Sequence, residues 1–217
     1  MALFLLLVFP LFFLLLIWLP WGLRSASETA FLVGTFFKGA LMFFPGFIAI
    51  LIFRRIFGFS YSGFVLFLSL LQRDQLVPLL AAIGSLLVLK SKLEISSVEE
   101  ENFLGVFAFL AGFMAMMDIA DMVRTWGNWD ASVLFFLPLQ RVSAVLVISL
   151  GARRFFPWEG RDAVWLLAVG AGLALGFSVP SFLFLISRGW WSFLLTVLPL
   201  LAAMLWFAMK FPRVVRA

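Results

Sequence analysis

Apolar runs long enough to cross a bilayer recur along this chain and limit its folds more than any other feature. A helix needs about 20 mainly apolar residues to cross the hydrocarbon core. Only 12% of the residues are charged and 65% are hydrophobic, whereas soluble domains are about a quarter charged. We predict an all-α, polytopic transmembrane helix bundle that forms a single integral membrane domain over residues 1–217. Its six secure spans are 3–22, 31–53, 103–123, 131–150, 163–187 and 190–209.

The region 59–90 is ambiguous because two apolar runs flank Gln72-Arg73-Asp74-Gln75. It could cross the membrane once, cross twice, re-enter, or lie at the interface before a single span. One crossing divides the fourteen loop Lys and Arg residues nine to five, with the amino terminus outside. Two crossings or a re-entrant turn divide them ten to four, with both termini cytoplasmic. Since cytoplasmic loops are rich in Lys and Arg, we predict a short re-entrant or double-crossing segment.

The first 27 residues have a second interpretation, as a cleaved signal, because Ser25-Ala26-Ser27 resembles a small-residue cleavage site. However, no basic segment precedes the apolar run, and the run exceeds the usual length of roughly 7 to 15 residues. An uncleaved span is favoured. The predicted location is the cell membrane, of the bacterial inner-membrane type.

The chain has no Cys and no His, so disulfides, thiol or imidazole catalysis and the common zinc and haem ligand sets are excluded. We therefore predict no metal, no cofactor and no catalytic residue, and a non-enzyme is favoured. The net charge of +5 lies mainly in loops beside helix ends, which is typical of a topology signal on an anionic bilayer. The expected partner is the lipid bilayer, and nucleic acid is not expected.

Three charged residues lie well within predicted spans, at hydrocarbon depth, where charges are costly and face the bundle interior. They are Lys38, Asp118 and Arg141, and Gln140 lies beside the last of them. The short connection between spans 103–123 and 131–150 brings Asp118 and Arg141 to comparable depth, so we predict that they pair or share a water-filled pocket. Lys38 either extends toward the interface or supplies a counter-charge to Asp118 or Asp74.

Asp121 and Arg124 continue the helical row that starts at Asp118, at steps of three residues. Because they approach the end of their span, we interpret them as an interfacial pair at the membrane edge. Arg73 and Asp74 form a secondary pair of interest at the polar centre of 59–90. Gly172 and Gly176 make a GxxxG pattern that predicts close helix packing, with a homodimer as one alternative.

Asp118-Ile-Ala-Asp121 resembles the opening of the metal-binding signature of CDP-alcohol phosphotransferases. Met122 replaces the glycine of that signature and no downstream aspartate pair follows. Glu100-Glu101 is similar to the glutamate pair of the intramembrane CAAX-type proteases, which also need histidines. Neither resemblance extends to the full set of residues that those chemistries require.

These features favour a small transport or permeation component, with Asp118 as a proton or cation site. The alternative is a non-catalytic membrane subunit or scaffold that binds partner membrane proteins through the same charges and the GxxxG face. A lipid-acting membrane enzyme comes third, because no nucleophile and base pair is evident.

Overall fold

The structure is a computed structural model that describes residues 26–56, 63–89, 99–124, 137–152, 159–186 and 189–210. Every element within these ranges is a helix, which agrees with the predicted all-helical class. The predicted span 3–22 and its signal alternative lie outside the described residues. The elements are α2 (Ala26–Ile56), α3 (Gly63–Leu70), the π-helix η1 (Leu71–Leu76), α4 (Val77–Leu89), α5 (Glu99–Arg124), α6 (Leu137–Ala152), α7 (Arg161–Leu185) and α8 (Gly189–Lys210).

Four of the described helices are long and apolar enough to cross a membrane: Ala30–Phe53, Gly63–Leu89, Phe103–Arg124 and Arg161–Leu185. The apolar helices Leu137–Ala152 and Trp190–Ala202 are shorter. The chain is therefore a helical bundle with several membrane-length helices, but the predicted count of six spans is not supported. The described part of α6 is Leu137–Ala152, and the earlier residues of the predicted span 131–150 lie outside the described ranges.

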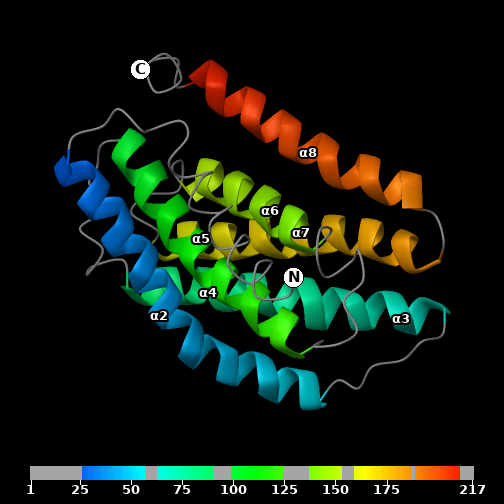
Figure 1. Ribbon diagram of the computed structural model, residues 1–217. Coiled ribbons are helices and arrows are strands. Elements are labelled where there is room, and N and C mark those ends of the chain that lie inside the picture. Colours follow the sequence, from blue (N-terminus) through cyan, green and yellow to red (C-terminus); the bar gives the residue numbers. More distant parts are fainter. Residues whose placement is uncertain are drawn as a thin grey trace.

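The prediction of a re-entrant or double-crossing segment at 59–90 is wrong. Elements α3, η1 and α4 follow one another without a gap and form one helix of 27 residues. Figure 1 shows this helix running through the bundle in a single pass. Its polar centre does not form a loop because Asp74 and Gln75 are buried, and Gln75 is hydrogen-bonded to Gln140 of α6. Gln140 of the neighbouring helix α6 thus provides the hydrogen bond that Gln75 would make to water if this region were an exposed loop.

The π-helical turn explains how this helix passes Pro78. In a regular α-helix the proline ring would clash with the carbonyl of Asp74, and the proline could donate no hydrogen bond to it. Directly before the proline, the backbone N–H of Val77 bonds to the carbonyl of Gln72, five residues back. This wider turn is a common way to accommodate a local break in the hydrogen-bond ladder. The helix therefore continues in spite of the proline.

Helix α5 is the best-buried element, with 83% of its apolar window inside the bundle, against 22% for α2 and 33% for α7. It packs between α2 and α6, while α7 contacts α8, α6, η1 and α4 (Figure 1). The outer faces of α2 and α7 carry exposed apolar side chains such as Phe37, Leu41 and Trp165. Such surfaces suit contact with lipid tails.

Two glycines allow α2 and α5 to approach closely. A Cβ added at Gly39 would lie 2.0 Å from the carbonyl oxygen of Phe109, and one at Gly112 would lie 2.0 Å from that of Phe36. Gly172 and Gly176 are instead exposed on α7, and no described atom lies within 4 Å of a Cβ placed there. The close packing predicted for this pair is thus not made by any described helix. Small residues do permit close packing in this protein, but they do so at the α2–α5 contact, at Gly39 and Gly112.

Substituting Gly39→Ala should destabilise the bundle, because the new methyl group meets backbone atoms that cannot move aside without separating α2 from α5. We expect a loss of about 2 kcal/mol or more, near the upper part of the range for overpacking, measured as a lower Tm in detergent. Gly34→Ala is the matched control on the same helix, since a Cβ there meets open space. Equal melting temperatures for the two variants would contradict the close approach.

Candidate functional site

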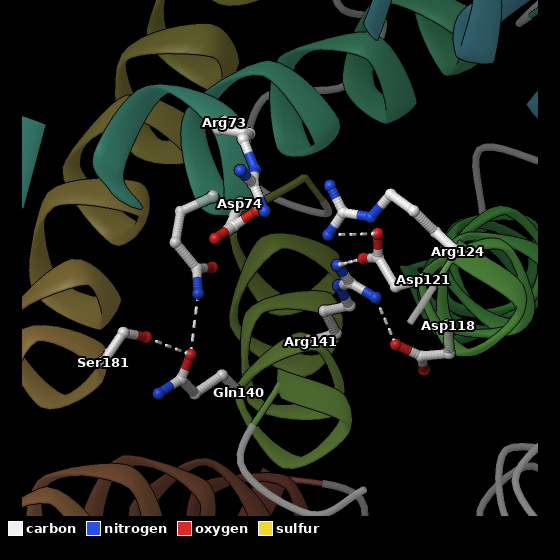
Figure 2. A network of polar contacts seen from close by, with 9 residues as sticks. Arg73, Asp74, Asp118, Asp121, Arg124, Gln140, Arg141 and Ser181 are labelled. Carbon is white, nitrogen blue, oxygen red and sulfur yellow. Dashed lines mark hydrogen bonds and ion pairs between the residues drawn. The ribbon is translucent and has the colours of Figure 1, made fainter. Parts of the chain in front are cut away.

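The guanidinium of Arg141 is buried between two carboxylates of α5. Its Nη1 donates to Asp118 Oδ1 and its Nη2 donates to Asp121 Oδ2. All three residues are at most 2% exposed. Figure 2 shows Arg141 reaching from α6 toward the two aspartates, which lie one helical turn apart. The structure thus places Asp118 against Arg141, the contact that the sequence predicts.

Helical geometry explains why one arginine can hold both acids. Residues three apart lie on the same face of a helix, so Asp118 and Asp121 present their carboxylates in the same direction. A planar guanidinium offers two terminal nitrogens that can each bond a separate oxygen. Lys could not reproduce this arrangement, because its charge sits on one nitrogen. We call Arg141, Asp118 and Asp121 the charged trio.

The interpretation of Asp121 and Arg124 as a pair at the membrane edge stays a prediction, because burial within the protein does not fix a depth in the bilayer. Arg124 Nη2 lies 3.3 Å from Asp121 Oδ1, and the Arg124 side chain is 37% exposed. Asp121 is buried and is also bonded to Arg141.

A second polar group, without charge, lies on the opposite side of α6. Gln140 Oε1 accepts hydrogen bonds from Gln75 Nε2 at 2.7 Å and from Ser181 Oγ at 3.0 Å. Gln140 Nε2 donates to Thr196 Oγ1 at 3.4 Å. The four residues come from η1, α6, α7 and α8, and we call them the Gln140 node. In Figure 2 the side chains of Gln140 and Arg141 leave α6 in different directions.

Arg73 and Asp74 lie near both groups, on η1. Arg73 Nε donates to Asp74 Oδ1 at 3.2 Å; the Arg73 side chain is 26% exposed and that of Asp74 is 11% exposed. This ion pair joins neighbouring residues and does not connect two helices. The predicted counter-charge Lys38 is an exposed side chain of α2, in contrast to the buried trio.

Two atoms of the charged trio have no hydrogen-bond partner among the residues that the structure describes. They are Asp118 Oδ2 and Arg141 Nε, both fully buried. Most buried polar atoms in proteins do have partners, so each exception calls for an explanation. The other such atom in the described part of the chain is Thr35 Oγ1 of α2.

The arrangement can bind or exchange charge, whereas covalent chemistry has little support. Ser143, Ser149 and Ser178 each donate to a carbonyl of their own helix, which is the ordinary behaviour of a helical serine and not that of an activated nucleophile. Across the described ranges, no group of three or more Asp, Glu, His or Cys side chains is placed to hold a metal ion.

Sequence reasoning found the pairing of Asp118 with Arg141 and singled out Gln140, but it missed Gln75, Ser181 and Thr196 as its partners. The sequence does contain a signal for Gln75, because it is one of four consecutive polar residues in an otherwise apolar region. The hydroxyls gave no signal, because serine and threonine are common in buried helices and satisfy themselves on the preceding turn. Comparison with family models, curated proteins and solved structures gives no match to this chain.

Replacing Arg141 by methionine should strongly destabilise the protein, because two carboxylates would remain buried without their cation. Breaking a buried ion pair from one side typically costs about 3–5 kcal/mol. We expect most of the Arg141→Met protein to aggregate on size-exclusion chromatography in detergent. Adding Asp118→Asn and Asp121→Asn to Arg141→Met should restore a monodisperse peak, since no buried charge is then left. A monodisperse peak for Arg141→Met alone would show that the two buried aspartates do not need Arg141 as their cation.

Proposed function

We propose that this chain is a small membrane permeation component in which Asp118 binds a proton or a small cation. The observation that carries the proposal is the buried Oδ2 of Asp118, which has no partner among the described residues although Oδ1 is held by Arg141. One carboxylate oxygen is thus fixed in place while the other is available to a ligand.

The charge balance of the trio supports the same ligand class. With all groups ionised, the two aspartates and one arginine carry a formal charge of −1. Arg124 offsets this only in part, because its guanidinium is partly exposed and, among the described residues, is paired with Asp121 and not with Asp118. A net buried charge is costly. A proton or a monovalent cation at Asp118 Oδ2 would make the trio neutral, whereas an anion would add to the excess.

A chain of contacts connects the Asp118 carboxylate to Arg124, whose side chain is partly exposed. It runs from Arg124 to Asp121, then to Arg141, and ends at Asp118. Because guanidinium groups keep their protons, these contacts do not relay a proton but provide a polar lining for the entry of a proton or a hydrated cation into an otherwise apolar bundle. The proposed path begins on the Arg124 side of the trio.

We place the chain in a cell membrane, of the bacterial inner-membrane type, with the carboxyl-terminal end of α8 in the cytoplasm. If each of the described helical segments crosses once, the positive residues divide unequally between the two sides. The cytoplasmic side then carries Arg24, Lys90, Lys92, Arg153, Arg154, Arg161, Lys210, Arg213 and Arg216, and the opposite side carries Arg54, Arg55, Arg124 and Arg188. This orientation follows the bias expected for cytoplasmic loops.

A second candidate is a non-catalytic membrane subunit that holds another membrane protein. The specific support is the exposed pair Gly172 and Gly176, which offers a small-residue face that no described helix covers. Under this alternative the partner contacts the glycine face rather than the charges, because the charged trio is buried and joins α5 to α6.

Proton flux in vesicles of anionic phospholipid, driven by a potassium diffusion potential and followed with a trapped pH-sensitive dye, tests the first candidate. Parallel vesicles with sodium or potassium gradients test the cation alternative. Asp118→Asn removes the site and the excess charge but keeps the side-chain shape, so it should lower flux at least tenfold while leaving the folded yield unchanged.

Ser149→Ala is the matched control, since it removes a buried polar group of α6 that bonds only within its own helix. It should retain native flux. Unchanged flux in Asp118→Asn would overturn the proposal. If the Gly172→Leu variant then lost a protein that co-purifies with the native chain in mild detergent, the second candidate would replace it.

A further inference from the structure

The four segments that meet at the Gln140 node share a property beyond their polar side chains. In each of them the backbone hydrogen-bond ladder is interrupted close to the node residue. Gln75 lies inside the π-helical turn η1. Gln140 follows Pro138 of α6 by two residues, and Pro138 has no N–H to donate to the backbone ladder.

The other two segments carry internal prolines. Ser181 directly follows Pro180 of α7, and Thr196 precedes Pro199 of α8 by three residues. A proline inside a helix removes one ladder bond and bends the helix. The carbonyl of Pro180 in turn accepts a hydrogen bond from Ser192 Oγ of α8 at 2.7 Å, so side chains tie the two bent helices together. The node therefore lies where all four segments deform most easily.

The node is also linked to the charged trio through adjacent residues. Arg141 and Gln140 are consecutive in α6, about 100° apart around the helix axis, and they bond to different neighbours. Since Pro138 interrupts the ladder beside them, the position of this part of α6 depends on these side-chain contacts. A change at Arg141 must then shift Gln140 as well.

We propose that the Gln140 node is the gate of the permeation path and that it opens when Asp118 becomes neutral. A proton or cation at Asp118 weakens its hold on Arg141, which remains bonded to Asp121. The guanidinium then moves toward Asp121, the part of α6 beside Pro138 follows, and Gln140 withdraws from Gln75 and Ser181. Water can then enter between η1, α7 and α8. This inference rests on the proposed function.

The charged groups around the moving guanidinium are few. Asp118, Asp121 and Arg124 come from α5, and the pair Arg73 and Asp74 comes from η1. Among them, Asp118 is the acid that combines a bond to Arg141 with a buried oxygen lacking a described partner. Neutralising Asp121 would instead strip Arg124 of its ion pair and leave Arg141 on Asp118, so it should not open the gate.

Thiol accessibility tests the opening without any assay of transport. The chain contains no cysteine, so Ser181→Cys places a single thiol at the node with one atom changed. Its rate of modification by a water-soluble maleimide should rise at least tenfold when Asp118→Asn is added, because a neutral side chain opens the node; flux still falls in this variant because the binding site itself is lost. The rate should stay low with Asp118→Glu or Asp121→Asn. Gln140→Ala should also raise the rate, because it removes the central side chain of the node.

The matched control thiol is Ser149→Cys, at a buried position on α6 whose hydroxyl bonds within its own helix. Its rate should not respond to Asp118→Asn, which distinguishes local opening from general loosening. The gate is refuted if Ser181→Cys reacts no faster after Asp118→Asn, or if both thiols accelerate equally.

A second measurement keeps Asp118 intact. Gln75→Cys with Ser181→Cys, bridged by a short bifunctional thiol reagent, should lower flux at least tenfold, and reduction of a cleavable bridge should restore it. Phe67→Cys with Phe182→Cys is the control pair, because these rings already contact each other between α3 and α7. Its bridging should leave flux unchanged. Flux that persists with the node bridged refutes the gate but not the permeation function. Absence of flux in the native chain refutes the permeation function, and the opening of the node is then decided by the thiol modification rates.

Discussion

The constraint on which the rest of the structure depends is the burial of a guanidinium that cannot lose its charge. Arg141 remains protonated in any protein environment, so a bundle that contains it must bring acids to it. Asp118 and Asp121 do this from a single face of α5. Their contact fixes the register between the end of α5 and the beginning of α6. Apolar packing alone would set that register less strictly, because neighbouring apolar side chains can slide past each other at small cost.

Helix α6 then separates two kinds of polar environment. On the side of α5 lie ionised groups whose mutual attraction is strong in a medium of low dielectric constant. On the side of η1, α7 and α8 lie amides and hydroxyls that exchange hydrogen bonds. The two environments meet at consecutive residues of one short turn. A local change in charge can therefore alter contacts among four helices without a long chain of intermediates, as a bistable packed element requires.

The sequence was informative where a residue type is rarely tolerated. An arginine in a hydrocarbon region needs a partner, and only a few acids lie within reach, so the pairing of Arg141 with Asp118 could be predicted. It was less informative about which charges are buried. Asp121 lies close to the end of the predicted span 103–123, yet its carboxylate is buried and bonded to Arg141. The polar run Gln72-Arg73-Asp74-Gln75 likewise suggested a turn, because its partners lie on other helices.

The sequence by itself determined that the chain forms apolar helices and that any buried charges are rare, since these follow from composition and from the cost of unpaired backbone groups in lipid. The tertiary structure alone decided that 63–89 is one helix, that the close α2–α5 contact is at Gly39 and Gly112, and that Gln140 joins four segments. The physical reason is that nearly every face of these helices is apolar. The pattern of side chains therefore does not distinguish the face that meets protein from the face that meets lipid, and only the packing of the helices against one another does.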